Sequence, residues 1–203
     1  MDYIKKFLGA KATITSSKWG FLTMEAASFT PAVDGDLIVH LGKPLEQNEP
    51  LVRIHSECLF GDVFHSTFCD CGRQLEMALD RMHHEGNGLL FYLRFDGRGA
   101  GLAAKVSATA LEVAGTDTYE SRMAIGVPPE GRDFTGIARY LQGKGIHKIR
   151  LLTNNPQKSE DLSRNGIEVD VIPLLIESPD EDVRRLYRTK ALKFHHSIPR
   201  SCT

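Results

Sequence analysis

The segment from Arg53 to Leu75 brings together several residues that could hold a metal ion. It reads RIHSECLFGDVFHSTFCDCGRQL and includes three of the four cysteines, with C-x10-C-x-C spacing: Cys58, Cys69 and Cys71. Thiolates are soft ligands that suit zinc, and three of them leave the fourth tetrahedral position free for water or a substrate. The segment therefore predicts a zinc site of the catalytic kind.

Other interpretations of the three cysteines stay open at the level of sequence. They could pack in the core, although the acid between Cys69 and Cys71 suits a core poorly. They could form a disulfide, although nothing in the chain indicates an oxidising compartment. They could hold a closed structural zinc, with His55 or His65 as the fourth ligand. A nucleobase deaminase is disfavoured, because the H-x-E sequence at His55 is not followed by P-C-x-x-C.

Composition limits the class of protein. The 203 residues are 41% hydrophobic and 25% charged, which is ordinary for a globular chain long enough to bury a core. The formal net charge of -1 gives no general attraction to nucleic acid. The N-terminus lacks the apolar core of a signal peptide, and no run approaches the roughly 18 apolar residues of a membrane span. We therefore expect a cytoplasmic protein, in a reducing compartment, without a nucleic-acid or membrane partner.

Strands and turns dominate the chain before the cysteine segment. Alternating and β-branched residues predict strands at Lys11–Thr15, Gly20–Met24, Asp36–Leu41 and Leu51–His55. The first two strands should pair as a hairpin across residues 16–19, and the last should deliver the cysteine segment. Residues 1–50 are therefore expected to be a strand-rich scaffold.

Two helices and a strand are expected after the cysteines. Apolar residues at helical spacing predict helices over Gly72–Gly86 and Leu102–Ala114, and the apolar run Leu89–Phe95 predicts a buried strand between them. The positive N-terminal end of the first helix would point at the thiolates. The glycine-rich sequence DGRGAGLAAK joins the strand to the second helix, a layout that can bind phosphate on backbone amides. Several cations favour the same ligand: Arg94, Arg98, Lys105, Arg132 and Lys158.

The second half of the chain alternates strands with helices. Residues 116–133 are expected to be a loop or broken helix, after which Asp133 can cap a helix over Phe134–Gln142. The remaining elements are predicted as a strand Lys148–Thr153, a helix from Pro156 to Asn165–Gly166, a strand Ile167–Ile176 and a terminal helix Pro179–His196. Helices between consecutive strands imply parallel crossovers. The predicted fold class is α/β (mixed α+β): a single domain over residues 1–203, with a mixed parallel and antiparallel sheet, flanking helices, and a C-terminal helix and tail at 179–203.

Four blocks of the sequence resemble the GTP cyclohydrolase II family, whose members are zinc enzymes that catalyse the first step of riboflavin biosynthesis. They read RIHSECLFGDVFHSTFCDCGRQLE, YLRFDGRGAGL, DTYESRMAIGVPPEGRDF and RLLTNNPQKSEDLSRNGI, and a weaker TK-x-x-K-x-x-H pattern follows at Thr189–His196. The similarity extends from about Arg53 to His196. It implies a mixed α/β domain that works as a homodimer and takes GTP. The implied reaction removes pyrophosphate, opens the imidazole ring and expels C8 as formate, which leaves a diaminopyrimidine ribotide.

The same resemblance implies roles for individual residues. Cys58, Cys69 and Cys71 fall on the ligands of one zinc ion per chain, and magnesium would accompany the triphosphate. Glu130 falls on the proton acceptor and Arg132 on an arginine proposed as a nucleophile; since arginine is almost never deprotonated, we favour a charge clamp. Nucleotide-contacting positions fall on Arg53, Ile54, His55, Ser56, Glu57, Gln74, Asp96, Gly97, Arg98, Thr118, Thr153 and Lys158, with Glu120 where a carboxylate could read guanine.

Several positions depart from the family pattern near the expected chemistry. The proton acceptor, usually aspartate, is Glu130, and a family tyrosine is Thr109. Where the family has a Q-E-G-R block, this chain has FDGR at Phe95–Arg98. Phe68 stands where the family has an arginine, and Ala104 where it has an asparagine. A shift of about 1 Å in a catalytic group can reduce the rate by on the order of a hundredfold. Three hypotheses therefore stay open: the complete reaction in the riboflavin pathway or a specialised one; a hydrolase that stops at the N-formyl ring-opened product or takes another purine nucleotide; and an inactive nucleotide-binding homologue.

Overall fold

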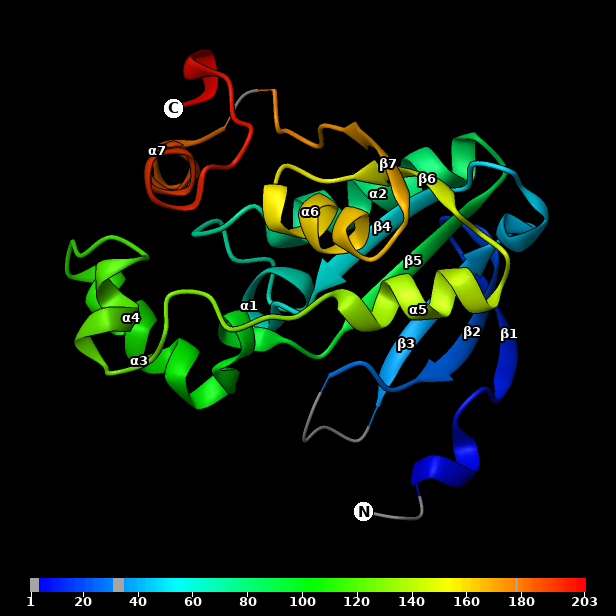
Figure 1. The fold of residues 1–203 in the computed structure, drawn as a ribbon. Helices are drawn as coiled ribbons and strands as arrows, with labels where there is room; N and C mark the ends of the chain where they lie inside the picture. The colour runs from blue at the N-terminus through cyan, green and yellow to red at the C-terminus, as the bar shows by residue number, and fades with distance from the viewer. Residues whose placement is uncertain (1–3, 31–34, 178) are drawn as a thin grey trace.

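Seven strands form one mixed sheet in the computed structural model of this chain, which describes residues 4–30, 35–177 and 179–203 (Figure 1). The predicted start of the domain at Met1 lies outside these ranges. The order of the strands in the sheet is β1-β2-β3-β5-β4-β6-β7. The strands are β1 (Lys11–Ser16), β2 (Gly20–Ala27), β3 (Asp36–Leu41), β4 (Leu51–Ser56), β5 (Gly88–Leu93), β6 (Lys148–Leu152) and β7 (Glu168–Ile172).

The pairing changes from antiparallel to parallel in the middle of the sheet. β1, β2, β3 and β5 are antiparallel neighbours, so the predicted hairpin is confirmed, with Ser16 opposite Gly20 at its closed end. β5, β4, β6 and β7 are parallel neighbours, and helices connect them as expected. The mixed sheet predicted from the sequence is therefore confirmed. Its parallel half is the part that leads into the cysteine segment.

Helices cover both faces of this sheet. Adjacent residues of β5 point to opposite faces: Leu90 shares an apolar cluster with Met82 of α2, and Phe91 shares another with Ile137 of α5 and Leu162 of α6. No helix in the described ranges is both long and apolar enough to cross a membrane. The helices are α1 (Leu59–Asp62), α2 (Cys71–His84), α3 (Gly101–Val113), α4 (Glu120–Ala124), α5 (Thr135–Gly143), α6 (Pro156–Arg164) and α7 (Glu181–Phe194), with 3-10 turns at Ile4–Phe7, Pro44–Glu46, Asp96–Gly99 and Arg200–Cys202.

Local capping explains where the helices of the second half begin. α6 starts at Pro156 as predicted, and the Asn155 side chain caps it. α5 starts at Thr135, slightly later than predicted, and the Asp133 carboxylate accepts a hydrogen bond from the Thr135 amide at 2.8 Å. β7 is shorter than predicted and stops before Pro173, which has no N–H to continue the ladder.

α3 turns its apolar stripe outward. The helix itself is predicted correctly, but Leu102, Val106 and Val113 are 43%, 52% and 71% exposed. Lys105 and Glu112, by contrast, are buried. Figure 1 shows α3 and α4 at one end of the molecule, away from strands β1, β2 and β3. Lys105 and Glu112 therefore face the interior, whereas Leu102, Val106 and Val113 face the surroundings.

Candidate active site

The parallel strands end at one cleft. β4 lies between β5 and β6 and runs in the same direction as both, so the carboxyl ends of the three strands meet at one edge of the sheet. The residues that follow these strands line the cleft, including Glu57 and Cys58 after β4, Asp96 after β5 and Thr153 after β6. The start of α2, the inner side of α3 and the C-terminal segment complete the lining.

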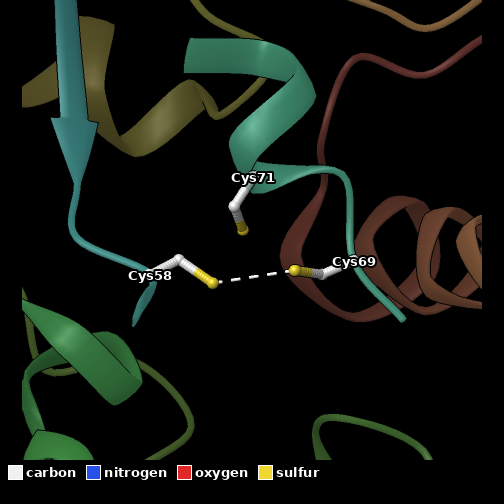
Figure 2. Close-up of side chains that lie close together, drawn as sticks. All are labelled: Cys58, Cys69 and Cys71. Carbon is white, nitrogen blue, oxygen red and sulfur yellow. Dashed lines mark hydrogen bonds between the residues drawn. The ribbon is translucent and has the colours of Figure 1, made fainter. Parts of the chain in front are cut away.

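Three thiols converge in this cleft. Cys58 follows β4, Cys69 precedes α2 and Cys71 is the first residue of α2, and the three sulfur atoms point toward one another (Figure 2). The Sγ atoms lie within 4.8 Å of one another, and those of Cys58 and Cys69 are 3.6 Å apart. Thiolates about 2.3 Å from a tetrahedral zinc would be about 3.8 Å apart from each other. The cysteines are free, not disulfide-bonded, and their arrangement fits a zinc ion.

No histidine or carboxylate joins the three thiols in the part of the chain that the structure describes. His55 Nε2 lies 3.1 Å from the Asp62 carboxylate oxygens, and its ring stacks on Tyr92. Burial lowers the pKa of His55, although Asp62 favours its charged form. His65 is exposed on the connection between α1 and α2. The geometry therefore matches a site with a free position better than a closed structural one.

Lys105 brings a positive charge to the thiols. From the inner side of α3, its Nζ donates to Cys58 Sγ at 3.0 Å and to Asp96 Oδ1 at 2.6 Å. Burial opposes the charged form, but Cys58 and Asp96 together raise the pKa of Lys105. Because a zinc ion with three thiolates is formally anionic, a cation at this position would offset its charge. The same contacts tie α3 to the end of β4.

Glu130 and Arg132 form a pair in the segment between α4 and α5. Arg132 Nε donates to Glu130 Oε1 at 2.7 Å, Nη2 contacts Oε2, and Nη1 donates to Ser56 Oγ at 3.1 Å. Burial alone would raise the pKa of Glu130, but the bonds from Arg132 lower it, so this group is a carboxylate at neutral pH. Gly99 allows the glycine-rich turn to approach this segment, because its Cβ would lie 3.1 Å from the Gly131 carbonyl oxygen and its φ is +90°.

Two further buried cations line the same cleft. Arg53 of β4 donates to the Leu152 carbonyl at 2.9 Å and to Gln74 Oε1 at 2.7 Å. Lys158 of α6 donates to the Ile54 carbonyl at 2.8 Å. Burial lowers the pKa of Arg53 to about 10, and burial and the nearby Arg53 charge lower the pKa of Lys158 well below its usual value. An anionic ligand would stabilise the charged forms of both groups.

α7 and the tail close the cleft. Lys190 donates to the fully buried Asp70 at 2.9 Å. The Arg98 guanidinium lies 4.7 Å from the centroid of the Phe194 ring, a cation–π contact. His196 also lines the cleft, where burial, followed by the charge of Lys190, lowers the pKa of His196 to about 2. The cleft thus joins segments from distant parts of the sequence.

All but two of the site residues proposed from the sequence line this cleft. The first exception is Ile54, whose side chain is fully buried in the core. The second is Glu120, which is exposed at the start of α4 and forms an ion pair with Lys193 at 2.6 Å. Arg94, one of the cations considered for phosphate, is also exposed and lies 2.9 Å from Glu57. Whether these residues contact a ligand stays a prediction.

The cleft contains further residues that the sequence analysis did not assign. Glu112 and Arg122 reach it from α3 and α4, and Lys190 and His196 reach it from α7 and the tail. The last two belong to the TK-x-x-K-x-x-H pattern, which was an available signal. Arg122 had none, because α4 has five residues and is too short to show a helical period.

A mixed α/β fold with such a cleft is typical of an enzyme that acts on an anionic substrate. Comparison with known proteins gives the family. The sequence matches the GTP cyclohydrolase II family over residues 10–172. It is 44% identical over 162 residues to the GTP cyclohydrolase-2 of Vibrio cholerae, covering 80% of this chain and 79% of that protein. It is 44% identical over 157 residues to that of Streptomyces coelicolor, covering 76% and 71%.

The chain therefore belongs to the GTP cyclohydrolase II family, and it is an enzyme of that family. The match starts well before the segment in which the sequence resemblance was seen, so the strand-rich N-terminal part belongs to the family domain as well. A solved structure of RibBX, a two-domain 3,4-dihydroxy-2-butanone 4-phosphate synthase from A. baumannii, aligns with 87% of this chain and 44% of its own at 16% identity. Its TM-score of 0.40 is too low to add to the comparison.

Proposed function

We propose that this protein is a zinc-dependent GTP cyclohydrolase II that opens the imidazole ring of GTP and releases formate and pyrophosphate. The product would be 2,5-diamino-6-(5-phosphoribosylamino)pyrimidin-4-one, in riboflavin biosynthesis or a related specialised pathway. The observation that carries this proposal is the meeting, in one cleft of a family member, of the thiols of Cys58, Cys69 and Cys71 with the Glu130–Arg132 pair.

Cys58, Cys69 and Cys71 would hold one zinc ion. The spacing of the thiols, and the lack of a fourth protein ligand in the described ranges, support a site with a free position. The metal would supply a water of lowered pKa for attack on the ring carbon. Lys105, which donates to Cys58, would offset the negative charge of the thiolates. The expected location is the reducing cytoplasm, where thiols stay available to a metal.

Glu130 would accept and return protons in the cleft. Arg132 holds it in the ionised form, in which both carboxylate oxygens are acceptors. Arg132 would act as a charge clamp on a phosphate, because a guanidinium stays protonated and already spans the distance from Glu130 to Ser56. Glu130 would thus transfer protons while Arg132, bonded to it, holds the substrate in place.

The remaining polar lining would bind and orient the nucleotide. Arg53 and Lys158 are buried cations whose charged forms an anion would stabilise, so we assign them to phosphate oxygens. Magnesium would accompany the phosphates. Glu120 would have to leave Lys193 to reach a guanine base. The other proposed contacts are His55, Ser56, Glu57, Gln74, Asp96, Gly97, Arg98, Thr118 and Thr153, with the backbone of Ile54.

Product analysis tests the proposed function. The zinc-loaded protein is incubated with GTP and magnesium, the nucleotides are identified by mass spectrometry, and formate and pyrophosphate are assayed in parallel. We expect formate, pyrophosphate and the diaminopyrimidine ribotide. GTP that stays unchanged, in a protein shown to contain zinc, would contradict the proposal and favour an inactive nucleotide-binding homologue. Parallel incubations with other purine nucleotides would reveal a different substrate.

A second candidate is a hydrolase that stops at the N-formyl ring-opened product. Thr109 of α3 lines the cleft at the position where the family pattern has a tyrosine. A threonine hydroxyl is a far weaker acid than a phenol and is attached to a much shorter side chain, so it cannot replace the phenol in proton transfer. In the same experiment this candidate predicts a product that retains the formyl carbon, with no formate.

We also propose that the protein works as a homodimer. The exposed side of α3 carries Leu102, Val106 and Val113, and Met123 of α4, a helix in contact with α3, is 53% exposed. Exposed apolar side chains gathered on one helix are typical of surfaces that another subunit covers. A second copy of the chain is the occupant that agrees with the expected assembly of the family.

A further inference from the structure

Arg122 has a buried guanidinium that donates no hydrogen bond to the part of the chain that the structure describes. The residue is 5% exposed and lies in α4, and it lines the cleft described above. Its Nε and Nη1 atoms are buried without a hydrogen-bond partner. Burial also lowers the pKa of Arg122. Since buried donors are nearly always paired in folded proteins, this side chain indicates a partner that is not part of the chain.

The other basic residues of the cleft differ from Arg122 in this respect. Each of them donates at least one side-chain hydrogen bond to a protein acceptor: Arg53, Arg98, Lys105, Arg132, Lys158 and Lys190. No such bond is present for Arg122 within the described ranges. The Nε atom of Arg53 is also buried without a partner, but its two other nitrogens donate to Leu152 and Gln74. Among these described cleft cations, Arg122 is therefore the one whose guanidinium donates no hydrogen bond to the protein and stays available to a ligand.

Carboxylates near Arg122 accept hydrogen bonds from other donors. Glu112 Oε1 accepts a hydrogen bond from Ser121 Oγ at 2.9 Å. Asp96 accepts from Lys105 and Glu130 accepts from Arg132. These three carboxylates act on Arg122 through their charge, but none of them is its hydrogen-bond partner.

Arg122 belongs to a group of like charges. Burial, and then the charges of Arg122 and Arg132, lower the pKa of Arg98 to about 10. Three guanidinium groups are thus close enough to repel one another while they line one cleft. Repulsion of this kind is relieved when an anion with several oxygens lies between the cations. The arrangement favours a phosphate chain over a neutral acceptor such as the carbonyl group of a purine base.

We propose that Arg122 is a further substrate-binding residue that donates hydrogen bonds to phosphoryl oxygens of the nucleotide, next to Arg98 and Arg132. This inference rests on the proposed function, because it assigns one group of that same cleft to the phosphate chain. Arg122 would then add affinity for the triphosphate and its pyrophosphate product, and it would add none for an unphosphorylated nucleoside.

Titration with pyrophosphate and with guanosine distinguishes a contact of Arg122 with the phosphate chain from a contact with the base. The zinc-loaded protein and its Arg122→Gln variant are titrated with each probe by calorimetry, at a fixed magnesium concentration. We expect pyrophosphate to bind about ten- to a hundredfold more weakly to Arg122→Gln, since it loses charge-assisted hydrogen bonds. Guanosine binding should change by less than about twofold. Arg164→Gln, which removes a charge from the exposed surface of α6, is the matched control and should bind both probes as the wild type does.

Two outcomes would overturn the inference. Equal pyrophosphate affinity of the wild type and Arg122→Gln would mean that Arg122 contacts no phosphate. A loss confined to guanosine would assign Arg122 to the base instead. Arg122→Met is a second variant, in case the glutamine substitution prevents folding: it removes the charge but keeps an unbranched side chain, so we expect a similar loss for pyrophosphate, and no loss would equally contradict the inference.

The inference and the proposed function fail in different ways. Formate release from GTP by the wild-type protein tests the function and does not depend on any variant. Pyrophosphate binding by Arg122→Gln tests the residue and does not require turnover. A wild type that releases formate but whose Arg122→Gln variant binds pyrophosphate normally would leave the function standing without this role for Arg122. A wild type that releases no formate would reject the function, whatever the variant binds.

Discussion

At the scale of single residues, the bonds between Glu130 and Arg132 decide the chemistry that the carboxylate can perform. They keep it ionised, and only an ionised carboxylate can accept a proton. We expect Glu130→Gln to reduce formate release by a factor on the order of 100 or more, while zinc content and GTP binding stay unchanged. Glu160→Gln, on the exposed face of α6, is the control and should be fully active. Unchanged formate release in Glu130→Gln would reject its role as a base.

We expect zinc content to depend on the three converging thiols and not on the fourth cysteine. Cys69→Ser removes one of these thiols, so the purified variant should retain little zinc by elemental analysis. Cys202→Ser lies in the tail, outside that group, and should contain as much zinc as the wild type. An undiminished zinc content in Cys69→Ser would contradict the proposed ligand set.

The cleft histidine gives a prediction about pH. Burial and the charges of Lys190, Arg132, Lys158 and Arg98 lower the pKa of His196 to about 2, whereas an unfolded chain has a histidine pKa of about 6.5. Between these values the unfolded state binds more protons, so stability falls as pH drops below about 6.5. At about pH 5.5 this group should contribute roughly 1 kcal/mol to the loss of stability.

Replacing this histidine should remove that part of the pH dependence. His196→Gln should lose less stability than the wild type between about pH 7.5 and pH 5.5, by roughly 1 kcal/mol in denaturant unfolding. His84→Gln, on the exposed surface of α2, is the matched substitution and should follow the wild-type curve. Identical curves for the wild type and His196→Gln would contradict the neutral state of His196 in the folded protein.

At the scale of elements, the contact between α1 and α2 sets the distance between the thiols. Gly61 and Gly72 cross closely there, since a Cβ at Gly72 would lie 2.2 Å from the Gly61 carbonyl oxygen. Gly72→Ala should push the start of α2, with Cys71, away from Cys58. We expect it to lower stability by roughly 1–3 kcal/mol and to release zinc more easily to a chelator. Gly143→Ala has nothing within 4 Å of its Cβ, so it is the control and should leave both properties intact.

The sequence predicted helix starts better than it predicted which face of a helix is buried. The start of α6 was predictable because Asn155 and Pro156 act locally. The existence of α3 was predictable from its period, but not that Val106 would face outward, since the same period describes a buried stripe and an exposed one. Glu120 and Arg122 are two residues apart on α4 and so cannot face the same way. Only the structure shows that Arg122 is the one in the cleft.

At the scale of the whole molecule, the cleft depends on contacts between distant parts of the chain. The ends of β4, β5 and β6 could be expected to meet, because parallel strands share one edge. The position of α7 and the tail over the cleft could not be predicted from strand order. Lys190 reaches Asp70 across 120 residues, and no local pattern encodes that contact. The cysteine segment was therefore recognisable by its residue types alone. The TK-x-x-K-x-x-H pattern marked Lys190 and His196, but only the fold shows that α7 lies against Asp70.

The outward face of α3 gives the prediction that belongs to the assembled protein. If a second copy covers Leu102, Val106 and Val113, the wild type should sediment at twice the chain mass of 22.6 kDa. Val106→Glu places a charge in the middle of that surface, where burial without a partner is unfavourable, so this variant should sediment as a monomer. Leu192→Glu alters the exposed side of α7, at a residue that is 77% exposed, and should stay dimeric. A monomeric wild type would reject the homodimer, and a dimeric Val106→Glu would place the interface on another face.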